Sequence, residues 1–481
     1  MLMPQNGMSK KEILETLQEY KKDDLDWKSG KITSYVYYPG DDAMGLINEA
    51  YTMYLTESAL DPTSTPSILK IENEIIGMIS SLVNGDENTV GNFTSGGTES
   101  VMMAVLAARN RARALRPEIK EPEIVIPFTA HACFHKAAHY LGVKVVSIPV
   151  KDSSFKADAD AMREAITENT IMLVGSAPGW AHGVVDPIRE IGRIALERGL
   201  LFHVDACVGG IHLPYMRKLG MTVPEFDFSV PGVTSMSVDI HKYGYAAKNA
   251  SVILYKNKEL RRYQMFACSN WPGYTIVNAT AGSSRTCGPL AAAWAVLIYF
   301  GDDGYMKIVK EVMAATKLLI DGINAIEGLE VLGDPDMCLF SFRSTSDKLN
   351  VYRIADELKR VGGWHAQPQF ARQNSESNLQ MGMTSMNVPL AEAMLNDLRG
   401  IAERLLKEEK TPNTANLALA MKNIKLKADE ETVNMLLNMA GVSNEKVPDS
   451  IEEVNTILES LPIDFTEYML TSYINNILKP A

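Results

Sequence analysis

A lysine and an aspartate, each at the end of an apolar run, are the residues of this chain best suited to chemistry. Lys242 follows the strand-like run 234–238, comes directly after a histidine and enters a glycine-containing turn. Asp205 ends a second strand-like run, 200–205. A lysine can form a Schiff base with pyridoxal phosphate (PLP), and a carboxylate can keep the pyridine nitrogen of this cofactor protonated, so that the ring accepts electrons. The pair predicts a PLP enzyme.

A glycine-containing segment upstream could bind the phosphate of that cofactor. Residues 92–100 read Asn-Phe-Thr-Ser-Gly-Gly-Thr-Glu-Ser and open a helix. The two glycines let the backbone approach an anion, and Thr98 adds a hydroxyl at the helix N-terminus. Such a segment on its own is more often only a helix cap. Its position ahead of Asp205 and Lys242 favours the phosphate-binding interpretation.

Three further side chains lie where they could contact the cofactor. His131 follows a predicted strand and could stack on the ring, although a lone histidine is more often structural. His241 could donate a hydrogen bond to the cofactor phosphate. Cys207 should face the same side of the chain as Asp205 and could pack on the ring opposite His131, or it could simply be a small buried apolar residue. The sequence assigns no role to His203.

Composition and charge limit the function further. The chain has 481 residues and a net charge of −12, which suits one large and one smaller domain and argues against a nucleic-acid partner. Its five cysteines form no CxxC pair and no metal-ligand cluster, so a reduced cytoplasmic protein without a metal is expected. The longest apolar run, 290–300, is shorter than the roughly 20 residues that span a bilayer. We therefore expect no membrane span.

Alternating helix and strand patterns must position the candidate residues. Strand patterns occur at 123–127, 144–149, 170–175, 200–205 and 234–238, with helical patterns between most of them. This alternation predicts an α/β fold with a mainly parallel sheet and helices on both faces. Ligands bind such sheets at the carboxyl ends of the strands, where Asp205 and Lys242 are expected.

The chain divides into four predicted parts. Two helical patterns, 290–300 and 305–326, lead out of the alternating region, and a strand–helix–strand–helix pattern then runs to a break at Thr411-Pro412. The predicted parts are an N-terminal helical segment and arm (1–65), a large PLP-binding domain (66–320), a small α+β domain (321–410) and a helical C-terminal extension (411–481).

The motifs of the chain resemble those of the sphingosine-1-phosphate lyase family. TSGGTES, TAHACFHKA, SAPGWAHGVVDP, HVDACVGG and DIHKYGYAAKNASVILY match in order and spacing, and the similarity covers residues 31–406. That family is a branch of the group II decarboxylase-like PLP enzymes. The resemblance implies the fold-type I PLP-dependent transferase architecture, which is aspartate aminotransferase-like.

The resemblance also implies individual roles. The positions that contact the cofactor are Lys242 for the covalent link, Asp205 for the ring nitrogen, His131 and Cys207 for the two ring faces, and Gly97, Thr98 and His241 for the phosphate. Family members are homodimers with shared active sites. Gly288 would accordingly reach the phosphate from the neighbouring chain.

Two reactions are compatible with such a site, a carbon–carbon lyase and an amino-acid decarboxylase, because substrate orientation decides which bond breaks. Lys248 and Tyr37 match the substrate-phosphate pocket of the lyases, and Trp180 and His182 match the lyase version of a strand end. Lys248 could also be an ordinary solvated surface lysine without a role in substrate binding. The resemblance implies retro-aldol cleavage of a phosphorylated long-chain amino alcohol to a fatty aldehyde and phosphoethanolamine.

One departure from the family keeps the decarboxylase interpretation open. Asp61 stands where the family has a histidine that helps to bind the substrate phosphate. A carboxylate in a substrate pocket would repel a phosphate dianion, by an energy on the order of several kcal/mol. The neighbouring Thr63, Ser64 and Thr65 are small and polar, which would suit an amino acid such as an aromatic or acidic one.

Overall fold

Seven strands form the central sheet of the computed structural model, which describes residues 3–61, 63–151, 153–408, 432 and 450–478. They lie in the order β1-β7-β6-β5-β4-β2-β3. The pairs from β3 to β6 are parallel, and β7 runs antiparallel to both of its neighbours. The strands are β1 (Val90–Thr94), β2 (Glu123–Pro127), β3 (Lys144–Ile148), β4 (Thr170–Ser176), β5 (Leu201–Asp205), β6 (Ser235–Asp239) and β7 (Ser251–Tyr255). The predicted mainly parallel sheet is confirmed.

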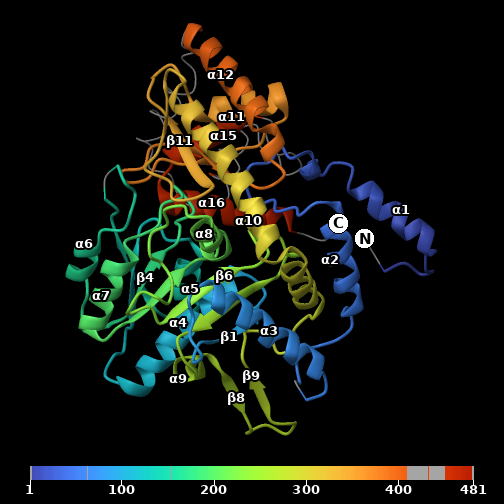
Figure 1. The fold of residues 1–481 in the computed structure, drawn as a ribbon, viewed down its shortest axis with the longest axis vertical. Helices are drawn as coiled ribbons and strands as arrows, with labels where there is room; N and C mark the ends of the chain where they lie inside the picture. The colour runs from blue at the N-terminus through green and yellow to red at the C-terminus, as the bar shows by residue number, and fades with distance from the viewer. Residues whose placement is uncertain (1–2, 62, 152, 409–431, 433–449, 479–481) are drawn as a thin grey trace.

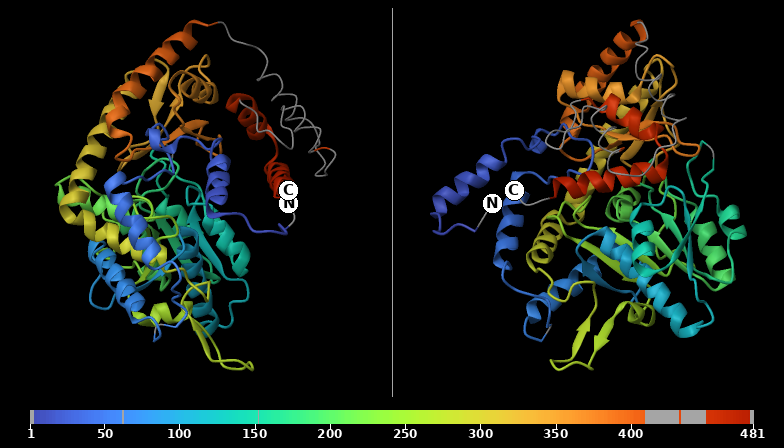
Figure 2. Two further views of the ribbon diagram at one scale, coloured as in Figure 1. Left: turned by 90° about the vertical axis from the view of Figure 1, so that its right-hand side faces the viewer. Right: turned by 180° about the vertical axis from the view of Figure 1, so that it is seen from behind.

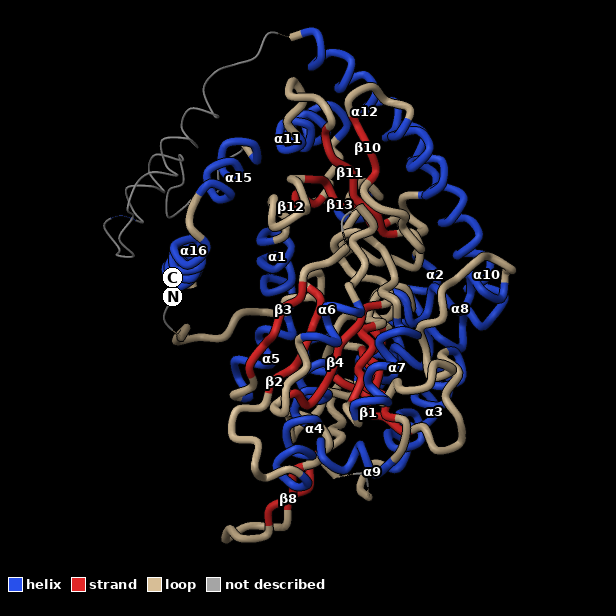
Figure 3. Tube along the Cα trace, turned by 90° about the vertical axis from the view of Figure 1, so that its left-hand side faces the viewer, coloured by secondary structure: helices blue, strands red, loops and turns tan. Residues whose placement is uncertain are grey.

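Helices cover both faces of this sheet (Figures 1 and 3). Ile124 and Ile126 of β2 pack in an apolar cluster with α4 and α5, whereas the intervening Val125 belongs to the cluster that contains α7. Successive side chains of a strand point to opposite faces, so a strand covered on both sides is apolar throughout. In the chain, α3 (Pro66–Leu82) precedes the first strand of the sheet and α9 (Lys258–Arg261) follows the last, and the helices between strands are α4 (Gly97–Leu115), α5 (Cys133–Leu141), α6 (Ala159–Glu164), α7 (Ile188–Arg198) and α8 (Gly209–Lys218).

A long helix, α10 (Gly288–Asn324), connects the large sheet to a smaller one (Figure 1). Gly301 kinks this helix with a non-helical φ of 53°, between the two helical patterns that the sequence predicts there. The smaller sheet is antiparallel, in the order β10-β11-β13-β12, and packs against α11. Its elements are β10 (Leu329–Val331), β11 (Leu339–Ser344), α11 (Val351–Gly362), β12 (Gln367–Gln369), β13 (Asn378–Gly382) and α12 (Ala391–Lys407).

The two ends of the chain add helices on the outside (Figure 2). Helix α1 (Lys10–Tyr20) begins with a capping box of Ser9 and Glu12 and buries no residue, and α2 (Asp41–Met53) packs along α10. Helix α15 (Ile451–Ser460) packs on α11 and leads to α16 (Ile463–Ile477). A hairpin, β8 (Phe266–Cys268) and β9 (Ile276–Asn278), projects at the end of the molecule that lies opposite the small sheet (Figure 1).

Most of the predicted C-terminal extension, residues 409–431 and 433–449, lies outside the described residues. The four domain boundaries therefore stay predictions. Within the part of the chain that the structure describes, every helix is too short or too polar to cross a membrane.

Candidate active site

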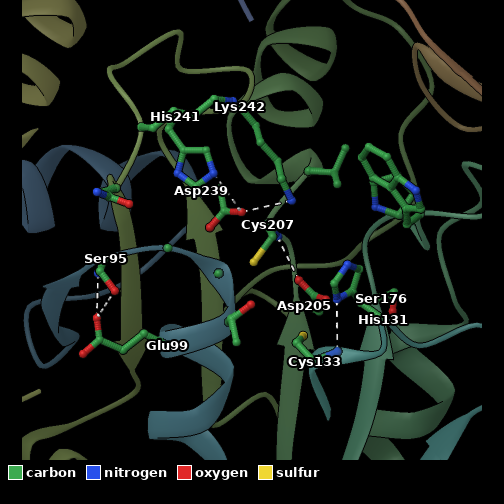
Figure 4. A pocket seen from close by; sticks show the side chains of 18 residues that line it. Ser95, Glu99, His131, Cys133, Ser176, Asp205, Cys207, Asp239, His241 and Lys242 are labelled. Carbon is green, nitrogen blue, oxygen red and sulfur yellow. Dashed lines mark hydrogen bonds and ion pairs between the residues drawn. The ribbon is translucent and has the colours of Figure 1, made fainter. Parts of the chain in front are cut away.

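A cavity of about 340 Å³ opens at the carboxyl ends of β4, β5 and β6, against the N-terminus of α4 (Figure 4). Its size falls within the ordinary range of ligand pockets, about 300–1,000 Å³. The strand ends contribute Ser176, Asp205 and Asp239 to its wall. This is the edge of a parallel sheet at which ligands are expected.

Lys242 reaches into the cavity three residues after β6. Its Nζ lies 3.0 Å from Oδ2 of Asp239, whose side chain is only 2% exposed. Burial by itself would lower the pKa of Lys242, but the Asp239 carboxylate outweighs it and holds this pKa above its usual value. Burial would raise the pKa of Asp239, yet Lys242 and His241 hold it below the usual range. The two groups form a buried ion pair.

Sequence reasoning assigned no role to Asp239. The signal was available, because an aspartate ends β6 just as Asp205 ends β5. Its Oδ1 atom is buried and has no hydrogen-bond partner among the described residues. A buried acceptor without a partner calls for an explanation, and a bound ligand that supplies a donor is one.

Asp205 is buried at the end of β5 and forms no ion pair with a described residue, although its charge helps to raise the pKa of Lys242. Its Oδ1 accepts hydrogen bonds from the Cys207 backbone N–H at 3.0 Å and the Ser237 hydroxyl at 3.3 Å. Within the described residues, its Oδ2 receives no hydrogen bond, and Asp205 lines the cavity. Buried acids are rare unless they are paired. The pyridine nitrogen of PLP, once protonated, is such a partner.

His131 and Cys207 both line the cavity, as expected of residues that contact the cofactor ring. Figure 4 shows their side chains close to Asp205, with Lys242 extending towards them. Nδ1 of His131 accepts from the Cys133 N–H at 3.2 Å, and desolvation lowers the pKa of His131, so its ring is neutral near pH 7. Burial raises the pKa of the Cys207 thiol well above its usual value. Cys207 therefore stays protonated.

The predicted phosphate cradle lies at the N-terminus of α4, where Gly97 and Thr98 line the cavity. The first N–H groups of a helix have no partner within the helix and bind anions. A Cβ added at Gly97 would lie 2.8 Å from both Oδ2 of Asp239 and Sγ of Cys207, so only glycine fits. The Ser95 N–H and hydroxyl both donate to Glu99, at 2.6 and 2.7 Å, so Ser95 is already occupied. The donors that can bind an anion are therefore the N–H groups of Gly97 and Thr98 and the Thr98 hydroxyl.

His241 lies beside this cradle and lines the cavity. Its Nδ1 donates to the Ala250 carbonyl at 2.8 Å, because a carbonyl can only accept. The neutral ring then has no proton on Nε2. His241 can donate to a phosphate only as an imidazolium, a form that burial opposes by lowering its pKa.

Two of the four residues that match the lyases, Trp180 and Lys248, line the cavity, and a third, Tyr37, lies against Lys248. Nζ of Lys248 donates to the Tyr35 carbonyl at 3.1 Å and lies 5.2 Å from the centroid of the Tyr37 ring. The Trp180 ring lines the cavity, with its centroid 5.6 Å from Nζ of Lys242. Lys248 is exposed to solvent and also lines the cavity, so it is a cation at the entrance.

Four expected residues do not line the cavity of this chain: Tyr37, which lies behind Lys248, and Asp61, Gly288 and His182. Asp61 is exposed and accepts from the N–H and hydroxyl of Thr63 at 2.8 and 2.7 Å. Gly288 is buried at the start of α10. His182 stacks on Phe155 with ring centroids 4.0 Å apart, behind the turn that carries Trp180. A contact of Gly288 with a neighbouring chain stays a prediction.

A lysine after β6, an aspartate at the end of β5 and a glycine cradle at the start of α4 define the class of the protein as a fold-type I PLP-dependent enzyme. Comparisons with known proteins agree. Residues 4–345 match the pyridoxal-dependent decarboxylase conserved domain, and residues 414–476 match a C-terminal putative HTH domain of pyridoxal-dependent enzymes.

Individual relatives narrow this class. The sphingosine-1-phosphate lyase of Dictyostelium discoideum is 40% identical over 82% of this chain and 73% of its own length. A probable L-aspartate decarboxylase of Pyrococcus furiosus is 33% identical over 75% of this chain and 94% of its own length. The solved sphingosine-1-phosphate lyase of Burkholderia pseudomallei is 32% identical, with a TM-score of 0.79 over 89% of this chain and 98% of its own. The chain belongs to the pyridoxal-dependent decarboxylase family, in the branch of the sphingosine-1-phosphate lyases.

The protein is a PLP-dependent lyase, and its described residues fit the cofactor. Asp205 offers a buried carboxylate that forms no ion pair with a described residue, Lys242 offers the amine, and the α4 N-terminus offers N–H groups beside a glycine that a Cβ would block. These observations account for the ring nitrogen, the aldehyde carbon and the phosphate of PLP.

Proposed function

We propose that this enzyme cleaves the C2–C3 bond of a phosphorylated long-chain 2-amino alcohol, similar to sphingosine-1-phosphate, and releases a fatty aldehyde and phosphoethanolamine. The observation that carries this proposal is the position of Lys248, a cation held over Tyr37 at the mouth of the cavity whose floor carries Lys242 and Asp205. The likeness to sphingosine-1-phosphate lyases supports it.

The floor of the cavity would hold the cofactor. Its residues are Lys242 for the covalent attachment, Asp205 for the ring nitrogen, His131 and Cys207 for the ring faces, and Gly97, Thr98 and His241 for the phosphate. When bound, PLP supplies an electron sink for the substrate bond that lies perpendicular to its ring. Asp239 keeps the Lys242 amine protonated until the cofactor enters, and Trp180 closes one wall.

The mouth of the cavity would hold the substrate. The ammonium group of Lys248 has three N–H donors, one of which the Tyr35 carbonyl uses, so the others are free for phosphate oxygens. Tyr37 stacks edge-on against Tyr243 at 5.1 Å, which fixes the ring under Lys248. A phosphate bound here would orient the amino alcohol relative to the floor, and orientation decides which bond breaks.

We further propose that the enzyme is a cytoplasmic homodimer with shared active sites. The resemblance assigns Gly288 to the phosphate of the neighbouring chain, and Gly288 does not line the cavity of its own. Helix α1 carries apolar side chains that are exposed in the single chain, among them Ile13, Leu14 and Leu17. All five cysteines are free thiols, as suits a reducing compartment.

The second candidate function is amino-acid decarboxylation. The identity with the probable L-aspartate decarboxylase favours it, since that relative is matched over nearly all of its length.

The objection that Asp61 raised against a phosphorylated substrate does not apply within this chain. Asp61 turns towards Thr63, outside the cavity of this chain. Asp61 therefore places no negative charge in the cavity of its own chain.

A product assay on the purified holoenzyme separates the two functions. The enzyme receives sphingosine-1-phosphate or a panel of amino acids that includes L-aspartate, and long-chain aldehyde, phosphoethanolamine and carbon dioxide are quantified. We expect equimolar aldehyde and phosphoethanolamine from the first substrate. Carbon dioxide from an amino acid, without aldehyde from sphingosine-1-phosphate, would overturn the proposal in favour of the decarboxylase.

A further inference from the structure

A buried chain of hydrogen bonds ends at Asp205 and begins at a histidine that the sequence left without a role. His203 is fully buried on β5, two residues before Asp205. Its Nδ1 lies 2.9 Å from the Ser235 hydroxyl and its Nε2 lies 3.3 Å from the Ser237 hydroxyl. The Ser237 hydroxyl in turn lies 3.3 Å from Oδ1 of Asp205. This series of hydrogen bonds therefore links the neighbouring strands β5 and β6 behind the wall of the cavity.

The chemistry of these groups fixes the direction of each hydrogen bond. Ser237 has one proton and two lone pairs, and three groups surround its oxygen: Asp205, Cys207 and His203. A carboxylate can only accept, so it takes the Ser237 proton. Cys207 donates its S–H across 3.3 Å, which leaves the remaining lone pair for Nε2–H of His203. Nδ1 then accepts from Ser235, and every group is satisfied.

The opposite arrangement fails. If His203 carried its proton on Nδ1, Ser237 would have to donate to Nε2 instead of to Asp205. The Ser237 oxygen and Oδ1 of Asp205 would then face each other at 3.3 Å without a proton between them. An unmade hydrogen bond to a buried charge is costly.

We propose that His203 is a positioning residue, which acts through Ser237 to hold the Asp205 carboxylate in the orientation that meets the pyridine nitrogen of the cofactor. This inference deepens the proposed function and rests on the assignment of Asp205 to the ring nitrogen. Two donors on Oδ1, the Ser237 hydroxyl and the Cys207 N–H, leave Oδ2 as the oxygen that meets the ring.

The surroundings of His203 keep it neutral and fixed in place. Phe134 of α5 contacts its ring edge-on, with centroids 5.9 Å apart. Burial lowers the pKa of His203 to about 4, and Asp205 is the only carboxylate among the described residues with a charge effect on it. A neutral histidine donates one hydrogen bond without placing a positive charge beside Asp205. The positive partner of Asp205 is thus left to the cofactor.

The test compares two cofactors that differ only at the ring nitrogen. The apoenzymes of wild type and variants are titrated with PLP and with the analogue in which C–H replaces the pyridine nitrogen, and both Kd values are measured. Ser237→Ala should weaken PLP binding about tenfold, because it removes a hydrogen bond to a charged group. His203→Leu should weaken it about threefold to fivefold, since it acts through Ser237. Neither should change the Kd of the analogue.

Two further variants sharpen the result. His203→Gln keeps a donor that can reach Ser237 and should recover most of the PLP affinity. The double variant of His203→Leu and Ser237→Ala should bind PLP no more weakly than Ser237→Ala alone, because the two residues act in one chain. His212→Leu is the matched control, since His212 is equally buried but contacts Cys338 rather than this chain. It should leave the ratio of the two Kd values unchanged.

Each outcome decides the question. A loss of affinity confined to PLP supports the proposal, whereas an equal loss for both cofactors, or no loss, overturns it. Asp205→Asn distinguishes this failure from failure of the underlying assignment. If Asp205→Asn also leaves the preference for PLP over the analogue intact, the assignment of Asp205 is wrong. The product assay on sphingosine-1-phosphate is independent of all these measurements.

Discussion

Replacing Lys242 by methionine should destabilise the cofactor-free enzyme in a pH-dependent way. The substitution keeps most of the volume of the side chain and removes its charge, which leaves the carboxylate of Asp239 without the ammonium group at 3.0 Å. The Asp239 side chain is 2% exposed, so water cannot replace the lost partner. Removing one partner of a buried ion pair costs about 3–5 kcal/mol.

The sign of the pH dependence follows from the pKa of Asp239. In the wild type, Lys242 and His241 hold this pKa below its usual range against the effect of burial, so the stabilisation is lost only as the pH falls through the folded-state value. In Lys242→Met burial dominates and raises the pKa of Asp239 above its unfolded-state value. The loss of stability is then complete above the raised pKa, and protonation of Asp239 restores stability as the pH falls. The two proteins should differ most near about pH 8 and least near about pH 5.

Denaturant unfolding of the apoproteins at the two pH values measures this difference. The matched control is the double variant of Lys242→Met with Asp239→Asn, which has no buried charge at this place and should recover most of the lost stability at the higher pH. An equal loss at both pH values, or a double variant as unstable as the single one, would refute the reasoning. Lys242→Met should also abolish turnover and the visible absorbance of covalently bound PLP.

Three further predictions follow from named contacts. Gly97→Ala should weaken PLP binding at least tenfold in a titration, because the new Cβ would lie 2.8 Å from a buried carboxylate and a buried thiol, whereas Gly400→Ala has open space and should not. Lys248→Ala should raise KM for a phosphorylated substrate about tenfold, with little effect on an unphosphorylated one, and the exposed Lys256→Ala should change neither. Glu459→Gln should lower stability by about 2 kcal/mol in thermal unfolding, because its carboxylate accepts from three groups of the small domain at 2.7–2.8 Å.

The strands that carry the site could be predicted from the sequence because they are short apolar runs buried on both faces. The prediction for β2 gives the observed bounds, and that for β5 differs by one residue. The strands β1 and β7 were not predicted as strands. Strand β1 reads Val-Gly-Asn-Phe-Thr, and glycine and asparagine are depleted in strands, so its pairing with β7 reflects tertiary contacts rather than local preference.

The side-chain partners at the site depend on strand register, which a single sequence does not reveal. In the structure β5 and β6 pair so that His203 lies opposite Ser235 and Asp205 lies opposite Ser237. Alternate residues of each strand therefore meet on the same face, and the hydrogen-bond chain follows. The His-x-Asp and Ser-x-Ser patterns are visible in the sequence. They predict hydrogen bonds between these side chains only once the two strands are known to be neighbours in the sheet.

The division between floor and mouth explains how one family can contain both lyases and decarboxylases. The floor consists of strand ends and a helix N-terminus, whose positions the buried sheet fixes. The mouth is built from connecting segments, namely the arm with Tyr37, the turn with Trp180 and the loop with Lys248. Substitutions there change where a substrate is anchored without disturbing the sheet. Because anchoring decides which bond stands perpendicular to the ring, we propose that the mouth sets the choice of reaction and that Lys248 is the residue of this chain that favours the lyase.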